Sequence, residues 1–172
     1  MHGSAKGKSR EEIMEQSSQF GIQMEGKKLR FEETASYGTD PGGIHNYLGY
    51  IPIGRAAAKI GKWSKQGATV YYLSSRRVKD EVEAIEAVLR KYGFPDYRNF
   101  LFRRQGEEYK DVAENLMPDV LIEDDCESIG GEKEMTYTNI SPEAKKKIHH
   151  IPVKEFIGIG HLPNELAQLA SY

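Results

Sequence analysis

Two short polar clusters in this 172-residue chain have the residue types needed to bind a phosphorylated ligand and a metal ion. Ser74-Ser75-Arg76-Arg77 follows the β-branched and aromatic run 69–73, and its hydroxyl and guanidinium groups suit a phosphate. Glu123-Asp124-Asp125 follows the apolar run 120–122, where crowded carboxylates favour a divalent cation. Three carboxylates with no adjacent histidine favour Mg²⁺ over zinc or copper. The same triplet is also typical of a solvated strand end, so both interpretations stay open.

Lys110 is a third candidate, because it begins a helical pattern that precedes the acidic strand. Its ammonium group would then lie at the same edge of the sheet as Asp124 and could hold a phosphate. A lone lysine on an amphipathic helix is more often a solvated charge. The expectation for Lys110 therefore depends on its combination with the two strand ends.

The apolar pattern indicates which elements would carry these groups. Helical spacing recurs over 53–63, 82–92 and 109–117, and short apolar runs at 69–73, 99–102 and 119–122 predict strands between and after these helices. A late strand is expected over 151–156, at a sheet edge because Pro152 has no N–H to donate. This alternation predicts βαβ units with a mainly parallel sheet, in which ligands bind at the carboxyl ends of the strands.

The first third of the chain is less regular. We expect an N-terminal segment over 1–50, with a small cap or insert, followed by a single α/β core over 51–172. Within the first segment the pattern indicates a helix over 10–16, a hairpin over 22–31 and a loop over 39–43.

Three other chemically notable residues are expected to be structural. His149 and His150 lie beside Lys145-Lys146-Lys147 and are interpreted as a solvated basic turn. Cys126 directly follows two aspartates, whose charges raise a thiol pKa, so a packed and inert cysteine is expected.

Composition narrows the class of function. A net charge of −2 gives no reason to expect nucleic acid, so a small ligand is the expected partner. The cluster from Ser74 to Arg77 favours a small phosphorylated molecule in that role. A single cysteine excludes an intramolecular disulfide and favours a reducing, cytoplasmic setting. The sequence has no run of eighteen apolar residues, so neither a membrane span nor an export signal is expected. The oligomeric state is unknown from the sequence.

The order of the candidate residues resembles a known superfamily. A strand ending at Ser74, a helix with Lys110 and a strand ending in Glu123-Asp124-Asp125 resemble the second, third and fourth motifs of the haloacid dehalogenase (HAD) superfamily. A closer similarity to a family of small, uncharacterised microbial HAD-like proteins covers most of residues 50–165. The segments that carry it are Ala35-Ser36-Tyr37, Ile51-Pro52-Ile53-Gly54, Tyr72 to Arg77, Phe102-Arg103-Arg104, Pro118 to Gly131, Val153 to Phe156 and Gly160-His161-Leu162-Pro163.

The resemblance implies a three-layer α/β sandwich with a mainly parallel, Rossmann-like sheet and the activity of an Mg²⁺-dependent phosphomonoester hydrolase. It implies that Ser74 and Lys110 hold the transferring phosphate, and that Asp124 binds Mg²⁺ with the help of Asp125 or Glu123. Ser75, Arg76 and Arg77 would then contact the substrate.

The chain departs from the family in one respect, because it has no DxDxT motif to supply the nucleophile and the general acid–base. Asp40 is the only aspartate before Asp80, and no second aspartate follows two residues later. The resembling proteins carry the nucleophile strand just ahead of a segment like Met1 to Ala5. We therefore expect an N-terminally truncated hydrolase, missing its first central strand. The alternatives are a non-catalytic HAD-like module that binds a phosphorylated ligand or a protein partner, and a purely structural α/β domain.

Overall fold

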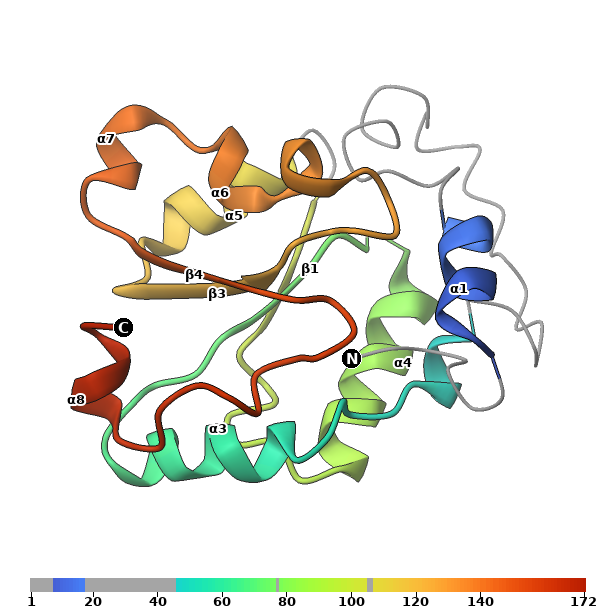
Figure 1. The fold of residues 1–172 in the computed structure, drawn as a ribbon, viewed down its shortest axis with the longest axis horizontal. Helices are drawn as coiled ribbons and strands as arrows, with labels where there is room; N and C mark the ends of the chain where they lie inside the picture. The colour runs from blue at the N-terminus through green and yellow to red at the C-terminus, as the bar shows by residue number, and fades with distance from the viewer. Residues whose placement is uncertain (1–7, 18–45, 77, 105–106) are drawn as a thin grey trace.

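The computed structural model describes residues 8–17, 46–76, 78–104 and 107–172, and it shows a mixed α/β fold with short parallel strands (Figure 1). The hairpin expected over 22–31 and the loop expected over 39–43 lie outside the described residues. The helices are α1 (Arg10–Ser17), η2 (Tyr47–Gly49), α3 (Ala56–Lys65), α4 (Lys79–Lys91), α5 (Tyr109–Leu116), η3 (Gly131–Glu134), α6 (Thr136–Asn139), α7 (Pro142–Lys145) and α8 (Leu166–Leu169). The strands are β1 (Tyr72–Ser74), β2 (Phe100–Phe102), β3 (Val120–Asp124) and β4 (His149–Val153).

The four strands form two separate parallel pairs. β1 pairs with β2 from Tyr72–Phe100 to Ser74–Phe102. β3 pairs with β4 over five residues of each strand, and its register begins at Val120–His149. Within the described ranges no strand joins the two pairs into one sheet.

Apolar spacing correctly predicts the three long helices of the core. α3 buries Trp63, and Gly67, with a φ of +104°, follows its end. α4 buries its apolar stripe of Val82, Ile85, Val88 and Leu89. α5 begins with reciprocal capping bonds between Glu108 and Asp111. The helix expected over 10–16 is also present, as α1.

β1 is shorter than its apolar run because side chains replace part of its ladder. The Val70 N–H donates to the Asp96 carboxylate at 2.9 Å, and the Asn99 side-chain amide donates to Val70 O at 3.1 Å. Regular pairing therefore begins only at Tyr72, whose N–H donates to Asn99 O at 2.9 Å.

The late strand lies earlier in the chain than expected, and the interpretation of His149 and His150 as a solvated basic turn is wrong. Both residues belong to β4 and are half-buried, because His149 N–H donates to Asp119 O and starts the pairing with β3. The His150 ring stacks on Tyr137 with a centroid separation of 4.0 Å. Pro152 lies on a strand that pairs only with β3 among the described strands, so its expected place at an edge is confirmed.

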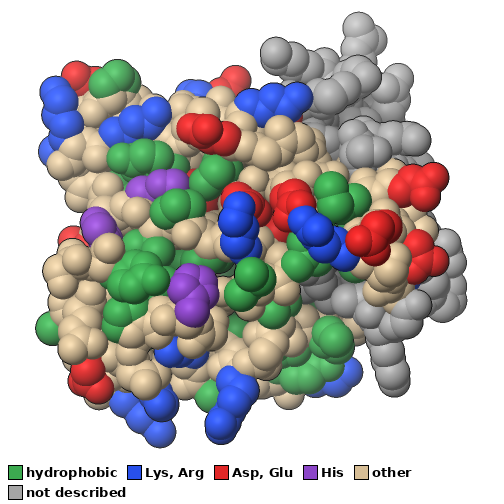
Figure 2. Space-filling view, in the orientation of Figure 1, with side chains coloured by type: hydrophobic (Ala, Val, Ile, Leu, Met, Phe, Trp, Pro, Cys, Tyr) green, Lys and Arg blue, Asp and Glu red, His purple; other side chains and the backbone are tan. Residues whose placement is uncertain are grey.

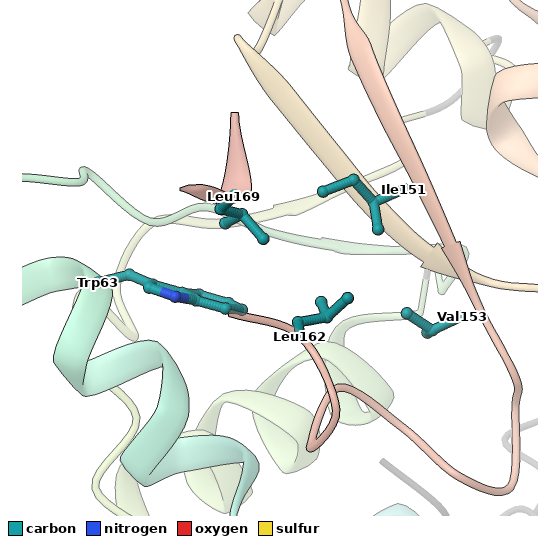
Figure 3. Close-up of a cluster of buried hydrophobic side chains, with 5 residues drawn as sticks. All are labelled: Trp63, Ile151, Val153, Leu162 and Leu169. Atoms are coloured by element: carbon teal, nitrogen blue, oxygen red, sulfur yellow. The ribbon is translucent and has the colours of Figure 1, made fainter. Parts of the chain in front are cut away.

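Apolar clusters cover both faces of β3 and β4. On one face Ile151 and Val153 pack with Trp63 of α3, with Leu162 and with Leu169 of α8 (Figure 3). On the other face Leu121 packs against a cluster drawn from α5, α7 and their neighbours, namely Ala113, Ile140, Ala144 and Ile148. Leu73 of β1 packs against this second cluster too, so the two strand pairs share one apolar core. In the described parts of the chain, no helix is long and apolar enough to cross a membrane.

Candidate functional site

The carboxyl ends of β1, β3 and β4 lie toward the same side of the molecule, on the right in Figure 1. Tyr109, at the start of α5, contacts the end of β1. Its hydroxyl donates to Leu73 O at 3.1 Å. Burial raises the pKa of this hydroxyl, and the charges of Glu123 and Asp124 raise it further. Ser74 and Asp124, which end β1 and β3, therefore lie toward the same side of the molecule.

At the end of β1, serines and arginines form a compact polar cluster. The Arg76 N–H donates to Ser74 Oγ at 3.2 Å, and the Arg76 guanidinium donates to Ser75 Oγ at 3.1 Å and to the Tyr47 hydroxyl at 3.0 Å. Arg103, only 3% exposed, donates its Nε–H to Ser75 O at 2.9 Å. Two guanidinium groups thus converge on Ser75, which suits an anion. Arg77 lies outside the described residues.

The pKa of Tyr50 is affected by Arg76 of this basic cluster and by acidic residues. Burial raises the pKa of Tyr50 to about 12, the charge of Arg76 lowers it, and the charges of Glu81 and Glu155 raise it. Glu155 comes two residues after β4, and its charge also raises the pKa of Cys126, which follows the acidic triplet.

The three carboxylates of the acidic triplet have different environments. Glu123 accepts N–H bonds from Thr136 at 2.8 Å and Tyr137 at 2.9 Å, and it lies 3.0 Å from His150 Nε2. Its two oxygens therefore hold the start of α6, on the opposite side of the strand from its neighbour Asp124. The predicted metal role of Glu123 would require this carboxylate to leave those bonds.

Asp125 is held by the residues that follow β4. Its Oδ1 accepts the Glu155 N–H at 3.1 Å, and its Oδ2 lies 2.8 Å from Lys154 Nζ. Burial acts to raise the pKa of Asp125, but these two bonds outweigh it and lower the pKa.

Asp124 is exposed, and its Oδ1 accepts the Cys126 N–H at 2.9 Å. Among the described contacts of the triplet, only Asp124 keeps an oxygen, Oδ2, without a hydrogen-bond donor. Within the described ranges no group of three metal-ligating side chains is assembled. Asp124 alone, or with Asp125, still fits Mg²⁺, which commonly takes one or two carboxylates together with water and phosphate oxygens.

Lys110 lies at the start of α5, bonded to carboxylates of its own helix turn. Its Nζ is 2.9 Å from Asp111 Oδ1 and 3.3 Å from Glu108 Oε2, and these bonds raise its pKa. In the described contacts the ammonium group beside the acidic triplet belongs to Lys154.

Glu155 ties the loop that follows β3 to the end of β4. Its carboxylate accepts bonds from Ser128 N–H at 2.7 Å and Ser128 Oγ–H at 2.6 Å. Burial raises the pKa of Glu155, the Ser128 bonds lower it, and the charges of Asp124 and Asp125 raise it. In the same loop, Cys126 is buried, which confirms the expectation of a packed cysteine, and burial and nearby carboxylates raise its pKa.

Sequence reasoning did not single out Tyr109, Lys154 or Glu155, and quoted Arg103 only within a resembling segment. Each acts through a contact between elements far apart in the chain, and the only available signal was that Lys154 and Glu155 directly follow an apolar strand pattern. Comparison with family models, with curated proteins and with solved structures finds no match to this chain.

Proposed function

We propose that this chain is the core of an HAD-like, Mg²⁺-dependent phosphomonoester hydrolase, organised as a three-layer sandwich that lacks one central strand. The missing strand would carry the nucleophilic aspartate. The observation that carries this proposal is the division of the parallel strands into two pairs, in which β1 and β3 each have one edge that no described strand pairs with.

The open edge of β1 is defined by its backbone bonds. Tyr72 directs its peptide groups to β2, since its N–H donates to Asn99 O. Peptide groups alternate along a strand, so those of Leu73 point away from β2. On that side the only described bond is the one from the Tyr109 hydroxyl to Leu73 O.

The open edge of β3 follows from the same alternation. His149 N–H donates to Asp119 O, and Asp125 N–H donates to Val153 O, so odd-numbered residues of β3 face β4. The peptide groups of Val120 and Ile122 therefore point away from β4. Among the described residues these two have no backbone partner on that side.

Burial supports an incomplete sheet. All of β1 and the first four residues of β3 are half-buried rather than buried, although apolar clusters cover β3 on both faces. Interior strands of parallel sheets are normally covered completely, and unpaired strand edges are costly. One further parallel strand would pair with Leu73 on one side and with Val120 and Ile122 on the other, making a five-stranded sheet.

A carboxylate at the end of that strand would lie between Ser74 and Asp124, where it could attack the phosphorus of a bound monoester. In this proposal the hydroxyl of Ser74 and the groups of Ser75, Arg76 and Arg77 bind the phosphate oxygens and the adjoining substrate. Asp124 would hold Mg²⁺, with Asp125 beside it, and the bound ion would neutralise charge on the phosphate.

The test is Mg²⁺-dependent hydrolysis of para-nitrophenyl phosphate by this chain and by a version extended upstream to include an apolar strand with a DxDxT motif. We expect the extended chain to be active and the 172-residue chain to be silent. Asp124→Asn in the extended chain should lower kcat by at least about 100-fold. Asp119→Asn, at the opposite end of β3, is the matched control and should keep activity. An inactive extended chain, or activity that survives Asp124→Asn, would contradict the proposal.

A phosphate-binding module without catalysis is a second candidate, favoured by the cluster at Ser75. In that cluster the guanidinium groups of Arg76 and Arg103 both donate to Ser75. In this case the unextended chain binds phosphate, and extension adds no hydrolysis.

A further inference from the structure

We propose that Lys154, rather than Lys110, is the lysine that binds the phosphate group of the ligand, at the carboxyl ends of β3 and β4. The inference rests on the proposed function for the presence of a phosphomonoester. It deepens that function by assigning the phosphate-binding cation to a different element from the one that the family resemblance implies.

Lys154 lies at the end of a strand and is exposed to solvent, so its ammonium group can reach a ligand. It directly follows β4, and its Nζ lies 2.8 Å from Asp125 Oδ2. Its side chain is 70% exposed, while that of Asp125 is 23% exposed. An ammonium group has three N–H donors, so two remain for another anion while the bond to Asp125 persists. Exposed ion pairs contribute little to stability, so Lys154 can also turn from Asp125 at small cost.

Lys110, in contrast, belongs to the start of its own helix. Both carboxylates that hold it, Glu108 and Asp111, also form the capping bonds of α5. Its side chain is 32% exposed, less than half the exposure of Lys154. Moving Lys110 to a phosphate at the end of β3 would break two ion pairs at a helix start, so its contacts indicate a structural role.

The surroundings of Lys154 set the conditions for binding. Basic and acidic side chains gather on the face shown in Figure 2, over the ends of β3 and β4. In the loop after β3, Glu127 forms a second ion pair with Arg10, whose guanidinium group also lies 5.4 Å from the centre of the Phe156 ring. Lys154 offsets the charge of Asp125, while the exposed carboxylate of Asp124 would repel a phosphate. Phosphate should therefore bind well only when Mg²⁺ neutralises Asp124.

The experiment is a titration of the full 172-residue chain with inorganic phosphate, with and without Mg²⁺, followed by phosphorus NMR. The variants are Lys154→Met, Lys154→Arg and Lys110→Met. We expect Lys154→Met to weaken Mg²⁺-dependent phosphate binding by about tenfold or more, and Lys154→Arg to restore most of it. Lys110→Met should change the affinity by less than about twofold, although it should lower the urea midpoint through the cap of α5.

The outcomes separate this inference from the function on which it rests. Loss of binding in Lys110→Met but not in Lys154→Met would overturn the assignment and leave phosphate binding intact. Equal binding by all variants would overturn it as well. If neither this chain nor the extended chain binds phosphate with Mg²⁺ present, the proposed function itself fails, and the assignment fails with it.

Discussion

Tyr109 is the side chain whose removal should reveal most about the junction between the strand ends. Its hydroxyl donates to the Leu73 carbonyl on the open edge of β1, and the charge of Asp124 helps to raise the pKa of this hydroxyl. This bond is part-buried, so water would replace the lost donor only in part.

Tyr109→Phe should therefore lower the free energy of unfolding by about 1 to 2 kcal/mol, measured by urea denaturation. Tyr71→Phe is the matched control, since Tyr71 is 46% exposed and its hydroxyl has no described bond. Equal stability of the two variants would mean that the Leu73 carbonyl does not need this donor.

At the level of residues, sequence predicts positions at strand ends better than it predicts contacts. Ser74 and Asp124 do lie at the ends of β1 and β3, because an apolar run followed by polar residues marks where a strand ends. Which carboxylate keeps a free oxygen depends instead on partners about thirty residues away or on a following turn, as the bonds of Asp125 and Asp124 illustrate. The same reason explains why Lys154 was not singled out.

Among the elements, β4, β3 and α6 meet around His150. Its ring stacks on Tyr137 of α6 and its Nε2 faces Glu123 of β3. Burial lowers the pKa of His150, Glu123 raises it, and the neighbouring charges of His149 and Lys145 lower it, with a net shift below 6.5. The folded protein therefore holds His150 neutral more strongly than the unfolded chain does.

This lowered pKa predicts how stability changes with pH. As the pH falls below 6.5, the unfolded chain takes up a proton at His150 that the folded protein resists, so stability falls until the folded pKa is reached. His150→Phe keeps a ring to stack on Tyr137 and removes the titration. Urea midpoints measured from about pH 7.5 to about pH 5 should fall less steeply in His150→Phe than in the wild type. The exposed His161→Phe serves as control, and a slope unchanged by His150→Phe would refute the coupling.

The sequence predicts the long amphipathic helices well and the short strands less well. α3, α4 and α5 follow their stripes because each buries one face over several turns. The bounds of a short strand depend on its pairing partner. Side-chain bonds from Asp96 and Asn99 to Val70 mean that β1 begins only at Tyr72. Pairing with β3 means that β4 includes His149 and His150. Alternation of helices and strands predicted parallel pairing, but not its division into two pairs.

At the scale of the whole molecule, helices connect the two strand pairs, and no strand in the described ranges pairs with both. Tyr109 of α5 bonds to β1, and Leu73 and Leu121 pack against the same apolar cluster, so the pairs face one core. Figure 2 shows hydrophobic side chains reaching the surface over β3 and β4.

Amide hydrogen exchange along β3, measured by NMR on this chain alone, tests the open strand position most directly. Leu121 and Glu123 face β4 and should exchange slowly, while Val120 and Ile122 face the open edge and should exchange much faster. In the upstream-extended chain all four amides should become slow. Slow exchange of Val120 and Ile122 in this chain would show that the edge is already covered, and unchanged fast exchange in the extended chain would show that the added strand does not pair there. Either result would contradict the account.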